Sequence, residues 1–488
     1  MDPTHSLDAL AQQTAQTPSF KTVVARLHSG ERDILLGGLP HSLAAFLLLH
    51  LQRTLDRAVL IVAADEDSAE QWRDNLQAIA GGQVVRYFPA WDTDVYDKRS
   101  PDVEITGLRI EAAMHLQQQQ LSIIVAPAKA LLTPLIPPDA MELATLHLKK
   151  GDEQPPDDVA SHLIDCGFER VATVDGLGQF SMRGGILDIY PFGSEHPFRI
   201  EFFGDEIDRI NCFDIETQLS TKSLQTVDVV ANLEHKLKSE DRQPLWSFLH
   251  ESTTYILPRI SDVCSVLNKL YEKSIEAHAT LEDPIAHAKP EDLFVRGLDF
   301  EKALVDRTTV HFRGKKMLNH IAFNCHPQPS FHRNFKHIVE HLTENQSKGI
   351  RNHIFCSSQP QADRFLQIAD ELVSEKLFDI HIVPLYRGFI DRQNQVACYT
   401  DHQFFERHHK FRLKNGYTKK QAISLKAFNQ LSVGDYVTHI DHGVGRFGGL
   451  QRIEVEGKQQ EAIKLIYGER DILYVSIHSL HKISKYSG

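Results

Sequence analysis

Apolar runs of strand length alternate with longer amphipathic segments over residues 33–132. Such runs occur at DILLGG, AVLIVAA, QVVRYFP and LSIIVAP, and helices are expected between them over 42–55, 67–80 and 104–119. Alternating elements of this kind predict a parallel sheet with helices on its faces. A second alternation starts at residue 331, with helices expected over 333–345 and 360–374, and predicts a further α/β domain.

Residues 178–214 have a different pattern, in which three runs of strand-forming residues follow one another without a helix. The runs cover 186–190, 198–203 and 207–213, and turn-forming residues separate them. Gly204-Asp205 has the length and composition of a two-residue hairpin loop. The pattern therefore predicts an antiparallel meander.

The middle strand of the meander has two chemically different faces. With a side-chain period of two, Phe198, Ile200 and Phe202 form one face, which we interpret as core. Arg199, Glu201 and Phe203 form the other. Two charges beside a large aromatic are typical of a docking surface. Alternatively, Phe203 packs under a neighbouring loop and Arg199 pairs with Glu201 or a nearby acid.

Residues 431–488 consist of short strand-forming runs with glycines at 443, 445, 448 and 449. Glycine bends between short strands predict a small, strongly curved barrel. Within it, residues 450–455 alternate apolar and polar. Histidines at 439, 442, 478 and 481 occur as two i, i+3 pairs on expected strand or turn, so the pairs do not converge. We therefore expect no zinc site.

Composition limits the function classes. The 488 residues are too many for one domain, and the 42% hydrophobic content allows each domain a core. A formal net charge of -12 argues against a chain that coats nucleic acid. The six cysteines include no C-x-x-C pair. The longest apolar run, 43–51, is too short to span a bilayer, so we expect a cytoplasmic protein that contacts no membrane.

The place of a phosphate-binding loop, after the first expected strand, reads GGLPHSL. A P-loop requires G-x-x-x-x-G-K-[ST], in which one lysine and backbone amides hold the phosphates. Here Gly37, Gly38 and Ser42 remain, the lysine is absent, and Pro40 removes an N–H. We expect no productive ATP binding. The acidic pair at 65–66 is interpreted as a helix cap.

Residues 178–214 closely resemble the segment shared by the excision-repair protein UvrB and the bacterial transcription-repair coupling factors. In that family the segment docks onto the UvrA ATPase, and the resemblance implies this role for Arg183, Arg199 and Phe203. The stretch HGVGRF and its surroundings resemble the RNA-polymerase-interacting domain shared with CarD-type regulators. By that resemblance Leu450, Arg452 and Ile453 contact the polymerase β subunit.

The resemblance covers the chain in order and implies a multidomain α/β protein: a degenerate RecA-like sheet, an inserted α+β domain, a second α/β domain and a CarD/Tudor-like β-barrel. The implied parts are a UvrB-like domain 1A with a degenerate ATPase half-site (1–145), an inserted UvrA-binding domain (146–230), a domain 1B completing the first (231–330), a middle α/β domain (331–402), a basic helical linker (403–430) and the barrel (431–488). UvrB's aromatic hairpin has no counterpart in 84–110, where Trp91 and Tyr96 are expected to pack.

Taken together, these features predict an adaptor that joins stalled RNA polymerase to UvrA. The alternatives are an enzyme, either of the UvrB excinuclease class or a complete translocase, and a CarD-like regulator fused to a UvrB-like scaffold. No G-x-x-x-x-G-K-[ST] occurs anywhere in the chain. ATP, magnesium and duplex DNA are therefore expected to belong to a motor that follows in a longer protein, and no catalysis is expected of these residues.

Overall fold

The computed structural model describes most of the chain. The described residues are 10–80, 84–97, 101–117, 122–137, 145–215, 217–230, 242–281, 283, 287–313, 320–370, 377–406, 433–439, 443–455, 458–467, 471–476 and 483–485. The chain divides into two compact units, Met1–Phe411 and Arg412–Gly488. The predicted linker over 403–430 lies almost entirely outside the described residues.

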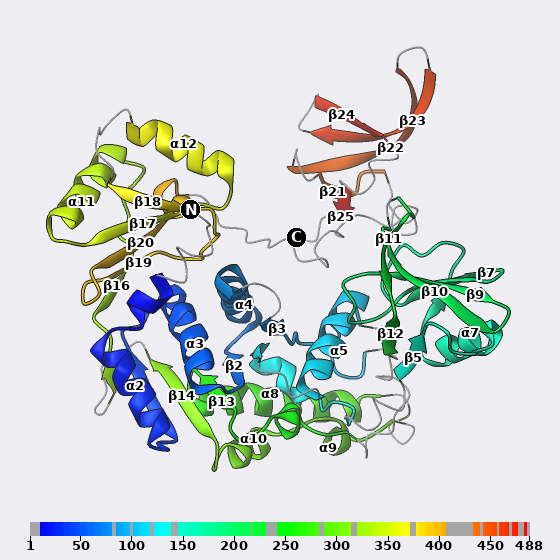
Figure 1. The fold of residues 1–488 in the computed structure, drawn as a ribbon, viewed down its shortest axis with the longest axis horizontal. Coiled ribbons are helices and arrows are strands. Elements are labelled where there is room, and N and C mark those ends of the chain that lie inside the picture. The colour runs from blue at the N-terminus through cyan, green and yellow to red at the C-terminus, as the bar shows by residue number, and fades with distance from the viewer. Residues whose placement is uncertain are drawn as a thin grey trace. The chain divides into compact units, whose positions relative to one another are not determined.

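The first unit is built on a seven-stranded sheet with the order β15-β1-β14-β13-β2-β4-β3. Its strands β2, β3, β13 and β14 are labelled in Figure 1. Every neighbouring pair in it is parallel, as the alternation predicts. The strands are β1 (Asp33–Gly37), β2 (Val59–Ala63), β3 (Val85–Tyr87), β4 (Ile123–Pro127), β13 (Thr254–Leu257), β14 (Thr308–Arg313) and β15 (Ile321–Ala322).

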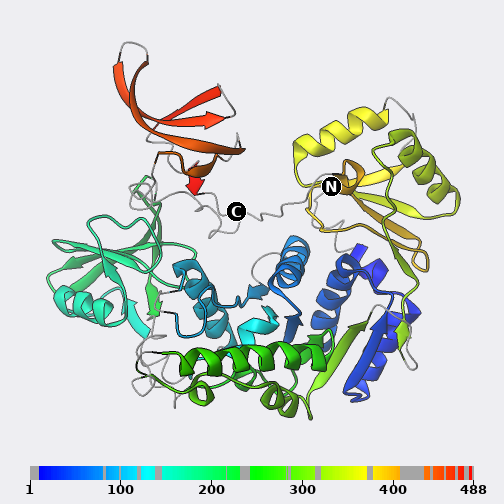
Figure 2. The same cartoon turned by 180° about the vertical axis from the view of Figure 1, so that it is seen from behind.

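Helices cover both faces of this sheet (Figure 2). In β2, Leu60 and Val62 point into one core cluster, whereas Val59, Ile61 and Ala63 point into another. The second cluster is closed by α2 (Pro18–His28), α3 (His41–Leu55) and α4 (Glu66–Ala80). The first is closed by α5 (Val103–Gln117), α8 (Ile260–Ala279) and α10 (Gly297–Ala303), with η1 (Ala128–Leu132), η3 (Leu245–Phe248) and α9 (Pro290–Leu293) beside them.

Residues between β4 and β13 leave the parallel sheet and form a separate one. The chain departs through β5 (Thr145–Lys149) and returns through β12 (Thr226–Val230), which pair antiparallel. Between them lies a six-stranded sheet with the order β11-β10-β9-β8-β7-β6. Its elements are α7 (Pro156–Asp165), β6 (Glu169–Arg170), β7 (Gln179–Arg183), β8 (Ile186–Tyr190), β9 (Phe198–Phe203), β10 (Glu206–Phe213) and β11 (Ser220–Leu224).

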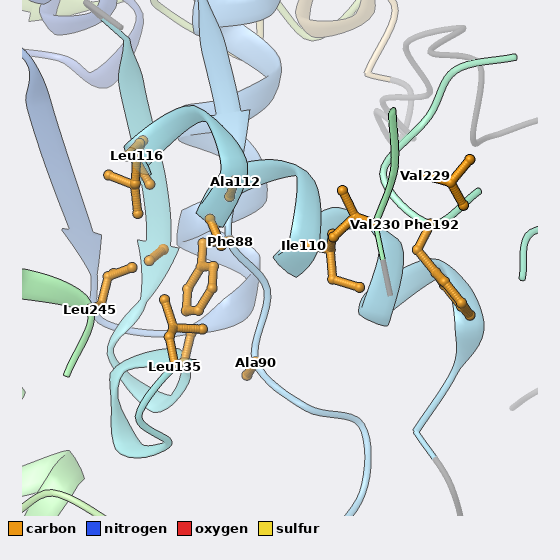
Figure 3. Close-up of a cluster of buried hydrophobic side chains, with 14 of the residues drawn as sticks. Phe88, Ala90, Ile110, Ala112, Leu116, Leu135, Phe192, Val229, Val230 and Leu245 are labelled. Atoms are coloured by element: carbon orange, nitrogen blue, oxygen red, sulfur yellow. The ribbon is translucent and has the colours of Figure 1, made fainter. Parts of the chain in front are cut away.

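The inserted sheet shares a core with the first domain. Its inner-face residues and those of α7 belong to the same cluster as the α5 side of the parallel sheet. Figure 3 shows Phe192, Val229 and Val230 near Ile110 of α5. Gly193 has φ +71°, and a Cβ there would lie 3.2 Å from the Glu111 backbone nitrogen, so the loop approaches α5 closely. The insertion is therefore packed against its host.

The second α/β part has a mixed five-stranded sheet with the order β16-β19-β20-β17-β18. Its elements are β16 (Cys325–Pro327), α11 (Phe335–Ser347), β17 (Arg351–Phe355), α12 (Gln359–Asp370), β18 (Phe378–His381), β19 (Phe389–Asp391), β20 (Val396–Thr400) and α13 (Asp401–Phe404). One face packs on α11, α12 and α13. The other joins the α3 cluster, where the Phe46 and Phe389 ring centroids are 6.3 Å apart.

Two predicted boundaries differ from this arrangement. β16 precedes residue 331 and pairs with β19, so a boundary at 330 cuts the second sheet. Phe404 and Phe405 are buried in its core, so a linker that begins at 403 cuts α13. Both segments are too short to show a periodicity, and only their long-range partners reveal where they belong.

Packing explains Trp91 and Tyr96, as predicted. The buried Arg109 guanidinium lies 4.3 Å from the Trp91 ring and 4.1 Å from the Phe88 ring. The Tyr96 hydroxyl donates to the Ala288 carbonyl at 2.7 Å.

Asp65 caps α4 by accepting from the Ser68 amide at 2.8 Å. No helix in the described parts of the chain is both long and apolar enough to cross a membrane.

The second unit contains a five-stranded sheet with the order β24-β23-β22-β21-β25. All its described pairs are antiparallel. The strands are β21 (Tyr436–His439), β22 (Gly443–Val455), β23 (Lys458–Tyr467), β24 (Asp471–Ser476) and β25 (Ile483–Lys485). Val437, Phe447, Ile463 and Leu465 form its core. Closure of this sheet into a barrel remains a prediction.

Two buried histidines lie on neighbouring strands of the second α/β sheet. The His353 Nδ1 and His381 Nε2 atoms are 3.0 Å apart, so one ring donates to the other. Burial, with a contribution from His381, lowers the pKa of His353 from 6.5 to about 4, and burial lowers the pKa of His381 too. Asp379 opposes both shifts without cancelling them. The folded chain thus excludes protons that the unfolded chain binds.

We expect the free energy of unfolding to fall as the pH drops from 6.5 toward about 4, because protons then favour the unfolded chain. For His353 the loss should approach about 1.4 kcal/mol per pH unit within this range. Melting curves against pH for H353Q/H381Q test this, with the exposed H326Q as control. The double variant should have a flatter pH dependence than the wild type and the control. An unchanged slope would contradict the assignment.

Candidate functional site

The meander forms as predicted, and its hairpin turn sets the register. Gly204 adopts φ +63°, a conformation that favours glycine, and Phe203 pairs directly with Glu206 across the turn. Phe198 and Ile200 are buried, and Phe202 packs against the same core. Arg199, Glu201 and Phe203 therefore lie on the opposite face. The register of β7 to β10 places side chains from all four strands on this face, which we call the outer face. Its residues are Arg183, Ile186, Asp188, Arg199, Glu201, Phe203 and Arg209.

One end of the outer face is covered and the other is open. Val174, Tyr190 and Phe213 form a small buried cluster beneath the loops near 171–177 and 215. The Arg199 guanidinium lies 5.0 Å from the Phe213 ring centroid, at the border of this cluster. Beyond the border no segment in the described part of the chain buries Phe203, whose exposed fraction is 83%.

A buried carboxylate joins the two arginines. Asp188 is fully buried and pairs with Arg199 across β8 and β9. Arg199 donates from Nε to Asp188 Oδ1 at 2.6 Å and from Nη2 to Oδ2 at 3.0 Å. Arg183 donates from Nη2 to Oδ2 at 2.6 Å. The hydrogen bond with Asp188 raises the pKa of Arg199, so the guanidinium keeps its charge.

The open end of the outer face combines apolar and charged groups. Ile186 is exposed and lies opposite both Arg183 and Glu201. Arg209 lies opposite Glu201 on the other side, with 4.0 Å between Nη1 and Oε2. An exposed phenylalanine and isoleucine among arginines match the composition of protein-docking surfaces. The arrangement suits binding and contains no described group poised for catalysis.

The structure distinguishes between the two interpretations of the outer face, a docking surface or side chains that pack within the chain. Phe203 does not pack under a loop, so that interpretation is wrong. The other half of that alternative is confirmed: Arg199 pairs with a nearby acid, which is Asp188. Asp188 and Ile186 were not identified from the sequence. Both residues belong to the outer face because β8 pairs with β7 and β9. The periodicity of a single strand does not reveal which strands pair.

The loop after β1 is packed on other parts of the first unit. A Cβ at Gly37 would lie 2.6 Å from His320 Cδ2, and one at Gly38 would clash with the Phe323 carbonyl oxygen. Pro40 precedes α3 and makes no side-chain cap. The buried Ser42 hydroxyl accepts from the Arg387 amide at 3.2 Å. Neighbouring Asn75 Oδ1 accepts from the Tyr386 amide at 3.0 Å. Backbone from 386–387 therefore lies at the start of α3, where phosphates would bind.

In the second unit, β22 has two differently paired parts. Gly443–Arg446 pairs with β21, whereas the part that contains Leu450, Arg452 and Ile453 pairs with β23 alone among the described strands. In the register of β22 and β23, Leu450 pairs with Ile463. Ile453 pairs with Gln460 in the same register. Among the described strands, none pairs with the second edge of this part of β22.

Among the described residues no group of three histidine, cysteine, aspartate or glutamate side chains is placed to hold a metal ion. Of the four histidines considered for zinc, those at 442, 478 and 481 lie outside the described residues.

Comparisons with known proteins agree with the predicted resemblance. Residues 146–235 match the model of the UvrB interaction domain, and residues 431–487 match that of the CarD-like/TRCF RID domain. Transcription-repair-coupling factors of Haemophilus influenzae and Bacillus subtilis are 24% and 23% identical over 93% and 99% of this chain. That of Myxococcus xanthus is 25% identical over 99%. The chain spans only 45%, 47% and 48% of these relatives' lengths.

The site geometry predicts different stabilities for two variants. Arg199→Ala should lower the free energy of unfolding of the inserted domain by about 3 kcal/mol, because it removes both bidentate bonds from a buried carboxylate. Phe203→Ala should change it by less than about 0.5 kcal/mol, because the side chain is exposed. Urea denaturation of both variants measures the difference. Equal losses would show that Asp188 does not depend on Arg199.

Proposed function

We propose that this chain is an adaptor in transcription-coupled nucleotide excision repair, which recruits UvrA through the inserted domain and binds the RNA polymerase β subunit through the C-terminal sheet. The two domain matches and the similarity to transcription-repair-coupling factors over 93–99% of the chain support this proposal. Such an adaptor would act in the cytoplasm. ATP hydrolysis and duplex-DNA binding would be carried out by the part of those relatives that this chain does not span.

The observation that carries the UvrA proposal is the exposure of Phe203 beside two arginines. Phe203 has 83% of its surface in water, and covering this apolar surface with a partner lowers the free energy of the complex. The guanidinium of Arg183, half exposed, can donate charge-assisted bonds to a carboxylate or carbonyl of the same partner. Aromatic and arginine side chains of this kind dominate the energetics of protein interfaces.

Phe203→Ala and Arg183→Ala should each weaken UvrA binding by about 2 to 4 kcal/mol, which is roughly 30-fold to 1000-fold in affinity. Leu219→Ala is the matched control for Phe203, since Leu219 is 67% exposed in the same domain. Titration calorimetry with UvrA gives the affinities, and the β subunit gives an internal control. Unchanged UvrA affinity in a folded triple variant of Arg183, Arg199 and Phe203 would refute the docking surface.

For the polymerase, we propose addition of a strand of the β subunit to the edge of β22 at residues 450–455. Strand addition supplies main-chain hydrogen bonds, and alternate side chains confer specificity. The singly paired stretch of β22 supports this choice of edge. Leu450, Arg452 and Ile453 are the proposed contact residues, and all three lie on this stretch of β22.

Ile453→Arg should reduce binding to the β subunit by at least about 10-fold without unfolding the sheet. Ile472→Arg provides the matched control, because Ile472 is exposed on β24 of the same sheet. Circular dichroism reports folding and surface plasmon resonance reports binding. If folded Ile453→Arg binds as tightly as the control, the β22 edge is not the polymerase site.

We further infer that the loop after β1 holds no nucleotide and that this chain has no cofactor. The inference rests on the absent P-loop lysine, Pro40 and the backbone of 386–387 at the start of α3. Displacing that backbone would expose Ser42 and Asn75, both of which are buried. This packing disfavours the enzyme alternatives for these residues.

Calorimetric titration of the chain with ATP and magnesium, up to millimolar nucleotide, should give no saturable heat. The physical reason is that neither a lysine nor a free helix start is available for the phosphates. A P-loop ATPase titrated alongside verifies the nucleotide. Saturable binding in the micromolar range would overturn the inference.

A further inference from the structure

The two arginines of the outer face use their donors differently. Arg199 donates from Nε and Nη2 to Asp188 and from Nη1 to the Gln218 carbonyl at 3.0 Å. Its side chain is 16% exposed, with the Phe213 ring against it. Each of its three nitrogen atoms therefore already has an acceptor inside the domain. Little of this guanidinium is left for a partner.

Arg183, in contrast to Arg199, uses few of its donors inside the domain. Its one described hydrogen bond runs from Nη2 to Asp188 Oδ2, and 51% of its side chain is exposed. That bond uses one of the several N–H groups of a guanidinium. The side chain pairs across the strands with the exposed Ile186.

The charges of Asp188, Arg183 and Arg199 also indicate that Arg183 is the arginine available to a partner. Asp188 carries one negative charge against the two positive charges of Arg183 and Arg199. Because Arg199 binds both oxygens of Asp188 in a bidentate pair, it largely neutralises that carboxylate. The net positive charge of the group of three then resides on Arg183, at the open end of the outer face.

We propose that Asp188 is a positioning residue for UvrA docking, which fixes Arg183 in place, and that Arg199 acts through Asp188 instead of touching the partner. The inference rests on the proposed UvrA docking. The surface that meets the partner is then Arg183, Ile186 and Phe203. This surface fits a partner patch with an acidic or carbonyl-rich rim around an apolar pocket.

The energetic advantage of this arrangement is preorganisation. A free arginine side chain loses rotamer freedom when it is immobilised in an interface. Arg183 has already lost part of that freedom in the free chain because Asp188 holds its Nη2. Removing Asp188 should therefore weaken binding even though Asp188 is fully buried and has no surface to offer a partner.

A double-mutant cycle in the full chain tests the proposal. Arg183→Ala and Asp188→Asn should each weaken UvrA binding, Asp188→Asn by about 10-fold. The double variant should bind no more weakly than Arg183→Ala alone, since Asp188 acts through Arg183. Arg183→Lys should recover part of the affinity. Arg209→Ala removes an exposed charge of the same face and should have a smaller effect than Arg183→Ala.

Additive losses in the cycle, or unchanged UvrA affinity in folded Asp188→Asn, would overturn the role of Asp188. If Asp188→Asn fails to fold by circular dichroism, the cycle is run with Arg199→Lys, which keeps the charge and loses the bidentate pair. Additivity of Arg199→Lys with Arg183→Ala would then overturn the proposal, because it means that Arg199 contacts UvrA directly. Failure of the wild-type chain to bind UvrA would instead refute the proposed function.

Discussion

A carboxylate with no exposed surface is stable in a sheet only if cations neutralise it, and Asp188 meets this condition through Arg183 and Arg199. The register of β7, β8 and β9 brings all three side chains together. The pairing also marks the border between the covered and open ends of the outer face. On one side Phe213 and Tyr190 are buried, and on the other Phe203 is left in water.

The outer face belongs to a domain that shares its hydrophobic core with the rest of the first unit. The inner face of the inserted sheet and one face of the parallel sheet contribute to a single core cluster. The other face of the parallel sheet shares its core with the second α/β sheet. Movement of the inserted domain against its host would separate apolar surfaces such as Phe192 and Ile110 (Figure 3). The docking side chains therefore project from a packed scaffold, which reduces the entropy lost on binding.

Periodicity predicted the local features well, because they depend on neighbouring residues. The two faces of β9 follow from a spacing of two, the hairpin at Gly204 from turn composition, and the alternation of β2 and α4 from an apolar run followed by an amphipathic segment. Spacing cannot predict which acid pairs with Arg199, because Asp188 lies on another strand. The same limit applies to β16 and β19, and to the contact of Tyr386 and Arg387 with the start of α3. These features depend on residues brought together from distant parts of the chain.

The central claim is that the open end of the outer face contacts UvrA, and site-specific photo-cross-linking tests it most directly. A benzophenone amino acid would replace Phe203 in one sample and Leu219 in another, since both positions are exposed in the same domain. On irradiation with UvrA, position 203 should give a cross-linked product, and position 219, beside the covered end, should give little. Equal products from the two positions, or a product from 219 alone, would contradict the account.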